Sequence, residues 1–222
     1  MGAVGRLHSI PNYERANKIL IAAKLSNVEI DYDPNFKFGV DNKTEEYIAK
    51  FPLGQAPAFE SKDGLLLTES DAITFYIASQ KENNPLLGSN KNDYAKILQY
   101  SYYGATQITP PALQLYMPLF GFAEYDKKVE ETAYTRIDKA LSYLDNEIKG
   151  KEYLVGNHIT LADVFMFCVM DGLYRMFYTK EHRDQYPNFS SYFERISQIP
   201  EVKEVVGEFK YAQERKKYTP KA

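Results

Sequence analysis

A change in hydrophobic periodicity near residue 80 constrains the fold of this chain more than any other feature. Before it, short runs with a period of two alternate with segments whose apolar residues recur every three or four positions. Beyond it, the pattern is helical throughout, as in the core-facing stripe of residues 129–148. A length of 222 residues can hold two small domains. We therefore predict a first domain over residues 1–80, a linker over residues 81–90 and an all-helical domain over residues 91–222.

The first domain is predicted to have the element order βαβαββα, which makes it an α/β domain with a mixed sheet. Thr44 is expected to cap the second helix, because its hydroxyl can accept a hydrogen bond from the first helical turn. Strands are expected near residues 4–7, 28–32, 58–60 and 65–68, and helices over residues 16–24, after Thr44 and over residues 69–80.

The second domain carries its own start and stop signals. Prolines between residues 110 and 118, with Gly121, are expected to end or kink a helix that begins near Asp93. Thr160 and Asp163 resemble a capping box, so a helix should start at Thr160. Further helices are expected over residues 188–198 and 201–214, and the lysine-rich end from residue 215 to 222 is expected to fray.

Charge and cysteine content exclude several classes of function. The 27 basic and 30 acidic side chains leave a net charge of −3, which gives no overall attraction to nucleic acid or to an anionic membrane. The single cysteine, Cys168, cannot form an internal disulfide, and the histidines lack ligand spacing, so we expect no metal site. No apolar run reaches the roughly 18 residues of a membrane helix, and no secretory signal is recognisable. We predict a cytoplasmic protein in which Cys168 is an inert core residue.

The segment Gln55-Ala56-Pro57-Ala58 leads from a helix into a strand and is the first candidate for ligand binding. Proline has no N–H to donate to a sheet, so it belongs at a first or edge position of a strand. If the Ala56–Pro57 bond is cis, the N–H and C=O of Ala56 point outward and can pair with an extended peptide. An ordinary trans turn is the alternative. These four residues alone favour it, because only about 5% of such bonds are cis.

Glu69 and Ser70 follow a strand and open a helix, which makes them the second candidate. Free N–H groups and the helix dipole at such an end attract a carboxylate. The simpler alternative is that Ser70 only caps the helix, as serine does in many proteins. The proline entry, the hairpin and this helix start all fall between residues 55 and 70, and this clustering favours a binding site.

Together these motifs resemble those of the glutathione transferases over essentially the whole chain. The resemblance lies in the βαβαββα unit with Ala56-Pro57 and Glu69-Ser70, followed by helices that carry Ile159-Thr160-Leu161-Ala162-Asp163. Residues 36–39, 42–44, 50–60 and 153–156 are most similar to the N-terminal domain of elongation factor 1B gamma. The implied fold is a thioredoxin-like α/β domain followed by an all-α domain. Because the gamma subunit continues into a further domain, this chain is either a stand-alone relative or part of a longer protein.

The resemblance implies a glutathione site. Gln55, Ala56 and Pro57 would hold the cysteinyl backbone, and Glu69 with Ser70 would hold the γ-glutamyl end. Gln55 stands where a lysine is often found, so we expect weaker binding of the glycyl carboxylate.

Catalysis in this family needs a hydroxyl or thiol near the end of the first strand, because the glutathione thiolate is the nucleophile. Serine-using members keep that hydroxyl where this chain has Pro11. Ser9, at the predicted strand end, and Tyr13, in the first helical turn, remain as candidates. Ser9 is preferred, although a turn serine without a catalytic role fits the sequence equally well. Arg15 either orients the thiolate or a neighbouring carboxylate, or lies on the helix surface.

Two functions follow from the resemblance. The first is conjugation of glutathione, as co-substrate, to a small apolar electrophile, whose pocket would be walled by aromatic residues between Tyr100 and Phe122 unless these form the core. The alternative is a weakly catalytic or non-catalytic scaffold of the elongation factor 1B gamma type that contacts other elongation factor 1 subunits. A homodimer is implied by the resemblance only.

Overall fold

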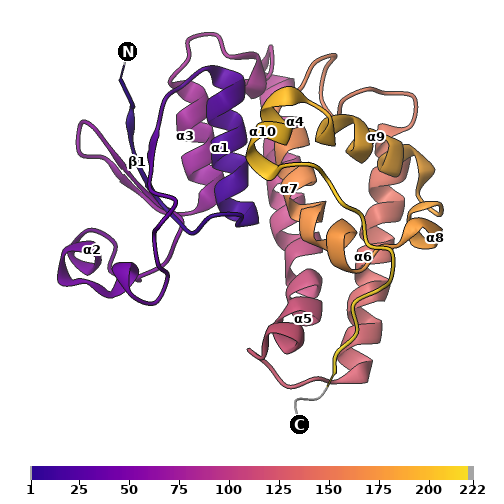
Figure 1. The fold of residues 1–222 in the computed structure, drawn as a ribbon. Coiled ribbons are helices and arrows are strands. Elements are labelled where there is room, and N and C mark those ends of the chain that lie inside the picture. The colour runs from indigo at the N-terminus through magenta and orange to yellow at the C-terminus, as the bar shows by residue number, and fades with distance from the viewer. Residues whose placement is uncertain (1, 220–222) are drawn as a thin grey trace.

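Four short strands form a mixed sheet in the N-terminal part of the computed structural model, which describes residues 2–219 (Figure 1). The strands are β1 (Gly5–His8), β2 (Asp31–Tyr32), β3 (Ala58–Ser61) and β4 (Leu66–Leu67), in the spatial order β2-β1-β3-β4. Strand β1 is parallel to β2 and antiparallel to β3, which is antiparallel to β4. The predicted order and mixed sheet are confirmed. The second strand is shorter than predicted, because Val28 still donates its N–H to Ala23 at the end of the preceding helix.

Two helices cover one face of this sheet and a third covers part of the other. Helices α1 (Glu14–Ser26) and α3 (Ser70–Ser79) bury Leu7 and Phe59 from the central strands. On the opposite face, α2 (Glu45–Lys50) follows the short turn η1 (Asp41–Lys43) and is capped at Thr44 as predicted. This helix covers only the end of the sheet near Ala58. The other end of that face is left open to solvent.

The C-terminal part is helical, and α7 lies at its centre. Eleven of the sixteen residues of α7 are buried, so this helix is surrounded by the others. Cys168 is one of the buried residues, as predicted. None of the helices within residues 2–219 has the length and apolar character needed to cross a membrane. The elements are η2 (Pro85–Leu87), α4 (Lys91–Tyr103), the π turn η3 (Gly104–Ile108), α5 (Thr109–Phe120), α6 (Lys127–Ile148), α7 (Leu161–Met176), α8 (Lys180–Arg183), α9 (Pro187–Ser197) and α10 (Pro200–Val206).

The π turn explains how the chain passes its cluster of prolines. Helix α4 runs through η3 directly into α5, which ends at Gly121 with a positive φ of 78°. Pro110 and Pro111 lie in the first turn of α5, where a missing N–H is tolerated. Gly104 lies close to α7, since a Cβ at this position would be 2.8 Å from Cε of Met166. The prolines therefore do not end the helix; a π turn precedes them, and the predicted end falls at Gly121.

The start of α7 is fixed by a buried carboxylate. The Asp163 side chain is fully buried and accepts hydrogen bonds from the Thr160 backbone N–H at 2.8 Å and the Thr160 hydroxyl at 3.1 Å. It also accepts from Leu154 N–H and from the Tyr192 hydroxyl, both at 2.9 Å. The predicted capping box is confirmed, and Asp163 joins the start of α7 to a loop and to α9.

The last helix is shorter than the sequence pattern predicts. A helix over residues 201–214 was expected, but α10 ends at Val206 and Gly207 takes a positive φ of 70° that stops it. Residues 207–219, which we call the strap, have no regular secondary structure. Figure 1 shows the strap, in yellow, running along α7 and α6. Two strap N–H groups, at Ala212 and Lys216, donate to backbone carbonyls near the end of α7 at 2.9 and 2.8 Å.

Side-chain contacts hold the strap down. The Arg215 guanidinium lies 3.9 Å from the centre of the Tyr134 ring, and its Nε donates to the Phe177 carbonyl at 3.3 Å. Tyr218 stacks on Tyr125, with 4.8 Å between ring centres. The prediction that the end frays is therefore wrong for residues 215–219; residues 220–222 lie outside the described residues.

Candidate functional site

A cleft of about 680 Å³ lies between the two parts of the chain. Helices α1 and α3 form one wall, and α4, the π turn and α7 form the other. Arg15, Glu69 and Ser70 line the first wall, whereas Leu98 and Phe165 contribute an apolar surface to the second. The cleft thus combines charged groups with an apolar wall, which is the usual composition of a small-molecule site.

The N-terminus of α3 opens into this cleft. Ser70 is the first residue of the helix and is half-buried, and its hydroxyl is 3.5 Å from Oδ1 of Asp71. Glu69, just before it, has a φ of 63°, a conformation that a residue with a Cβ rarely adopts. Such outliers are frequent at ligand sites, where the surrounding structure maintains them. The unpaired N–H groups of this helix end favour a carboxylate ligand.

A hydrogen-bonded network at the cleft joins the two parts of the chain, and sequence reasoning missed it. Asp71 accepts from Lys18 Nζ with Oδ1 and from the Ser101 hydroxyl with Oδ2, each at 2.6 Å. Lys18 belongs to α1, Asp71 to α3 and Ser101 to α4. The only sequence signal was the place of Asp71 in the first turn of a helix, which does not reveal the partners.

The predicted proline entry has a cis peptide bond between Ala56 and Pro57. Within residues 2–219, no hydrogen bond occupies the main-chain N–H or C=O of Ala56, so both are free to pair with an extended ligand. The carbonyl of Gln55 accepts a hydrogen bond from the Tyr47 hydroxyl at 2.6 Å, which anchors the segment to α2. Gln55, Ala56 and Pro57 do not line the cleft that contains Ser70.

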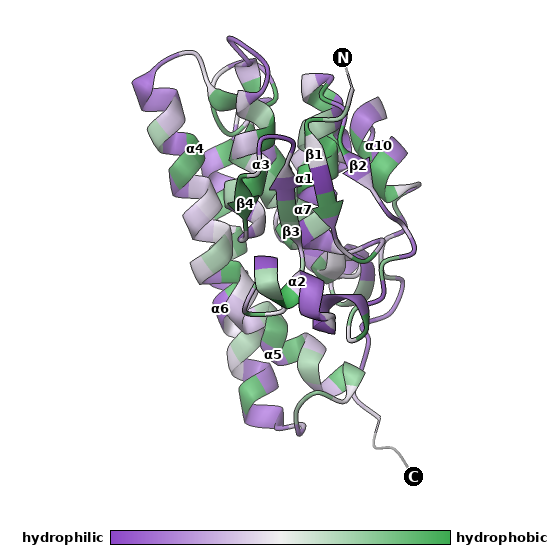
Figure 2. Cartoon of the chain, turned by 90° about the vertical axis from the view of Figure 1, so that its left-hand side faces the viewer, coloured by the Kyte–Doolittle hydropathy of each residue, from purple (hydrophilic) through white to green (hydrophobic). Residues whose placement is uncertain are grey.

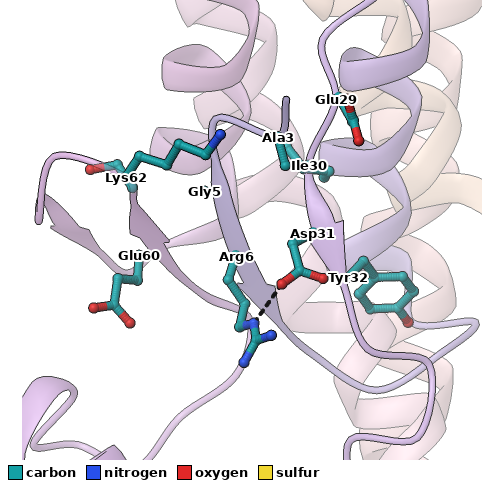
Figure 3. Close-up of a pocket in the computed structure, with 10 residues that line it drawn as sticks. Ala3, Gly5, Arg6, Glu29, Ile30, Asp31, Tyr32, Glu60 and Lys62 are labelled. Carbon is teal, nitrogen blue, oxygen red and sulfur yellow. Dashed lines mark hydrogen bonds and ion pairs between the residues drawn. The ribbon is translucent and has the colours of Figure 1, made fainter. Parts of the chain in front are cut away.

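A second hollow, of about 750 Å³, lies on the open face of the sheet (Figure 3). At its centre Arg6 donates from Nε to Asp31 at 2.7 Å, and this partner raises the pKa of the Arg6 guanidinium. Glu60 and Lys62 stand to one side in Figure 3. Both acidic and basic side chains line this hollow, and the Arg6 and Asp31 side chains already form an ion pair with each other. In the described part of the chain, no three or more His, Cys, Asp or Glu side chains are grouped to hold a metal ion.

Comparison with known proteins identifies the family. The model for the glutathione S-transferase N-terminal domain matches residues 3–79, and the model for the C-terminal domain matches residues 105–200. The chain belongs to the glutathione S-transferase family. Elongation factor 1-gamma from Artemia salina is 36% identical over 98% of this chain, and elongation factor 1-gamma-A from Xenopus laevis is 37% identical over 94%. These alignments cover 50% and 48% of the two relatives, so the chain spans about half their length.

Solved structures of the family share the fold. The glutathione S-transferase-like domain of elongation factor 1-gamma from Saccharomyces cerevisiae superimposes with a TM-score of 0.83, covering 99% of this chain and 100% of that one at 24% identity. Glutathione transferase F2 from Populus trichocarpa gives a TM-score of 0.80 over 91% of this chain and 97% of that one, at 20% identity. At these identities the likeness is one of fold.

Of the three residues expected to activate a glutathione S-transferase thiolate, Arg15 lines the cleft, whereas Ser9 and Tyr13 are not among its lining residues. Ser9 is fully buried, and its Oγ has no hydrogen-bond partner within residues 2–219. Tyr13 immediately precedes α1, and burial raises the pKa of its hydroxyl. Arg15 lines the cleft, with its guanidinium 6.0 Å from the Tyr13 ring centre. Ser9 and Tyr13 are not among the residues that line the cleft, and their role in activating a thiolate stays a prediction.

The aromatic residues considered for an electrophile pocket separate into three groups. Tyr102 lines the cleft, as the prediction required. Tyr100 is buried in the helical core. Phe120 and Phe122 are exposed at the far end of α5. Of the aromatic residues between Tyr100 and Phe122, Tyr102 is therefore the one that lines the cleft.

Proposed function

We propose that this chain is a glutathione S-transferase-fold module of the elongation factor 1-gamma type, which contacts other elongation factor 1 subunits and has little or no conjugating activity. The burial of Ser9 carries this proposal, because the Oγ of the preferred catalytic residue is not exposed to a ligand. The proposal is supported by the likeness to elongation factor 1-gamma along nearly the whole chain. A homodimer and a cytoplasmic setting follow from it as further expectations.

The energy of thiolate formation explains why the missing hydroxyl matters. A thiol with a pKa of about 8.5 is only a few per cent ionised at neutral pH. Lowering that pKa by about two units takes roughly 2.7 kcal/mol of preferential thiolate stabilisation. Loss of one such donor typically reduces a rate by about 10²–10³-fold. We therefore expect turnover this far below that of an active transferase.

A paired assay tests the proposal. Glutathione-dependent turnover of a chromogenic electrophile is measured together with the rise in Tm caused by glutathione. The Pro11→Ser variant, which restores a hydroxyl where serine-using family members have one, should raise the rate. Binding is then measured between the full chain and purified elongation factor 1 subunits. Wild-type turnover equal to that of an active transferase, with no binding to any subunit, would refute the proposal.

The second candidate function is conjugation of glutathione to a small apolar electrophile. It is favoured by the presence of Ser70, at an anion-attracting helix end, and of an apolar wall that includes Phe165 in one cleft. Glutathione would then lie with its γ-glutamyl end at Glu69 and Ser70, and its cysteinyl backbone would pair with Ala56. In this case Ser9→Ala or Tyr13→Phe should abolish turnover, and assaying the two variants separately identifies the hydroxyl.

A further inference from the structure

A small hollow lies next to the cleft, where the start of α1 meets α5 and α7. It shares Glu14, Thr109 and Val169 with the cleft, so the two spaces adjoin. The hollow has a volume of about 10 Å³, which is room for one group of about the size of a water molecule. A ligand in the cleft can therefore place one small head group here. We call this space the inner hollow.

Three residues that line the inner hollow carry oxygen acceptors on their side chains, namely Glu14, Thr109 and Tyr116. All three residues are half-buried. In the described part of the chain, no other residue forms a hydrogen bond or an ion pair with any of these side chains. The Tyr116 hydroxyl lies over Gly172, where an added Cβ would be 2.7 Å from it. Polar groups withdrawn from water need partners, so the inner hollow favours a ligand that brings hydrogen-bond donors.

The charge of the inner hollow comes from Glu14. Among the described residues that line it, no other one is charged. Burial raises the pKa of the Glu14 carboxyl, as expected for an acid withdrawn from water. Lys18, one turn further along α1, is already paired with Asp71 at 2.6 Å, and Arg15 lines the cleft but not the inner hollow. A cation that enters from the cleft therefore meets a carboxylate without a counter-ion.

The cleft beside the inner hollow suits an apolar chain. Residues 97–123, which include the π turn and α5, contain no Asp, Glu, Lys or Arg. Figure 2 shows α5 mostly in the green of hydrophobic residues. Leu98 and Phe165 add apolar side chains to the cleft wall. The cleft volume of about 680 Å³ lies in the range of about 300–1,000 Å³ that is typical of small-molecule sites.

We propose that the inner hollow binds the ammonium group of a small-molecule primary amine whose apolar chain lies in the cleft. An ammonium group has three N–H donors and no acceptor, which matches the side-chain oxygens of Glu14, Thr109 and Tyr116. A water molecule brings fewer donors and no charge, and an anionic head group would be repelled by Glu14. This site goes beyond the proposed function and does not depend on contact with elongation factor 1 subunits.

The test uses the full chain and dansylcadaverine, a fluorescent primary amine with a short alkyl chain. Glu14→Gln should weaken its binding at least tenfold, and Tyr116→Phe, which removes one hydroxyl, by about threefold or more. The matched control is Glu69→Gln, the same chemical change in the cleft but outside the inner hollow, which should alter the affinity less than twofold. Acetylating the amine of the probe should weaken binding at least tenfold, and this comparison needs no variant.

The pH dependence of binding gives a second readout. The groups that face the Glu14 carboxyl are Arg15 and Lys18 of α1, Tyr116 of α5 and Asp171 of α7. A primary amine stays protonated below about pH 10, so affinity lost on acidification reports proton uptake by the protein. Because burial raises the pKa of Glu14, this loss should begin well above the ordinary carboxyl value of about 4.3. Glu14→Gln should remove it.

Four outcomes would overturn the inference. Two concern the probe, namely no binding at about 1 mM and equal affinity for the acetylated form. The third is an equal loss from Glu14→Gln and Glu69→Gln, which would place the amine elsewhere in the cleft. The fourth is an unchanged affinity in Glu14→Gln, which would assign the inner hollow to water only. Gly172→Ala, which narrows the hollow without changing its charge, should weaken binding in parallel with Glu14→Gln.

Discussion

Replacing Asp163 with asparagine should destabilise the chain far more than loss of an ordinary helix cap. The two carboxylate oxygens divide four donors between them: Oδ1 accepts from Leu154 and Tyr192, and Oδ2 accepts twice from Thr160. Asparagine keeps one acceptor oxygen and turns an NH₂ group toward the other two donors. A buried donor left unpaired costs about 1–3 kcal/mol.

Relief of charge burial offsets part of this loss. Burial raises the pKa of the Asp163 carboxyl, so removing the charge regains some desolvation energy. We therefore expect Asp163→Asn to lower the free energy of unfolding by about 2–3 kcal/mol, and Asp163→Ala, which removes every acceptor, by about 4 kcal/mol or more. For a chain of this size, 2–3 kcal/mol corresponds to a fall in Tm of about 4–12 °C.

Urea unfolding followed by circular dichroism measures these values, with the slope of the transition as a check on two-state behaviour. The matched control is Thr44→Ala at α2, an exposed cap whose oxygen accepts one hydrogen bond at 3.3 Å. Its loss should cost about 1 kcal/mol. If Asp163→Asn costs no more than Thr44→Ala, the four hydrogen bonds do not stabilise the start of α7 as argued.

Three further changes test other parts of the structure. Arg215→Ala removes the contact with Tyr134 and should speed tryptic cleavage of the strap, with a loss of about 1–2 kcal/mol; unchanged cleavage would contradict the packing described. Burial lowers the pKa of His8, so the unfolded chain takes up a proton that the folded chain resists. Stability should therefore fall as the pH drops below about 6.5, and His8→Phe should flatten that pH dependence of unfolding. Ser101→Ala should cost about 1.5–3 kcal/mol in urea unfolding, because Asp71 loses a partner, whereas exposed Ser142→Ala should have little effect.

Local signals in the sequence were enough to locate most helices. Thr44 begins a helix because its hydroxyl oxygen accepts from the N–H of Tyr47, and Thr160 begins one because its N–H and hydroxyl donate to Asp163. Both interactions lie within four residues. The strap was missed for the opposite reason. Its position depends on Arg215 meeting Tyr134, which lies far away in the sequence, and the apolar spacing of residues 201–214 suits a helix until Gly207 ends it.

The candidate site likewise combines features that follow from local sequence with features that depend on contacts between distant residues. The place of Ser70 at a helix end followed from its position after a strand, and the structure puts it in the cleft. The network of Lys18, Asp71 and Ser101 could not be predicted, because three separate helices supply it. The burial of Ser9 could not be predicted either, since burial is set by the fold as a whole and not by the residues next to it in the sequence.

The π turn between α4 and α5 decides which side chains of α5 meet water. Each residue advances a helix by about 100°. The wider turn at Gly104–Ile108 therefore changes the direction in which the side chains of α5 point relative to those of α4. Deleting a single residue there would rotate Leu113, Met117 and Phe120 by more than a quarter turn relative to α4. A change in the number of residues in this turn would thus point the exposed side chains of α5 in another direction while the sequence of α5 stayed the same.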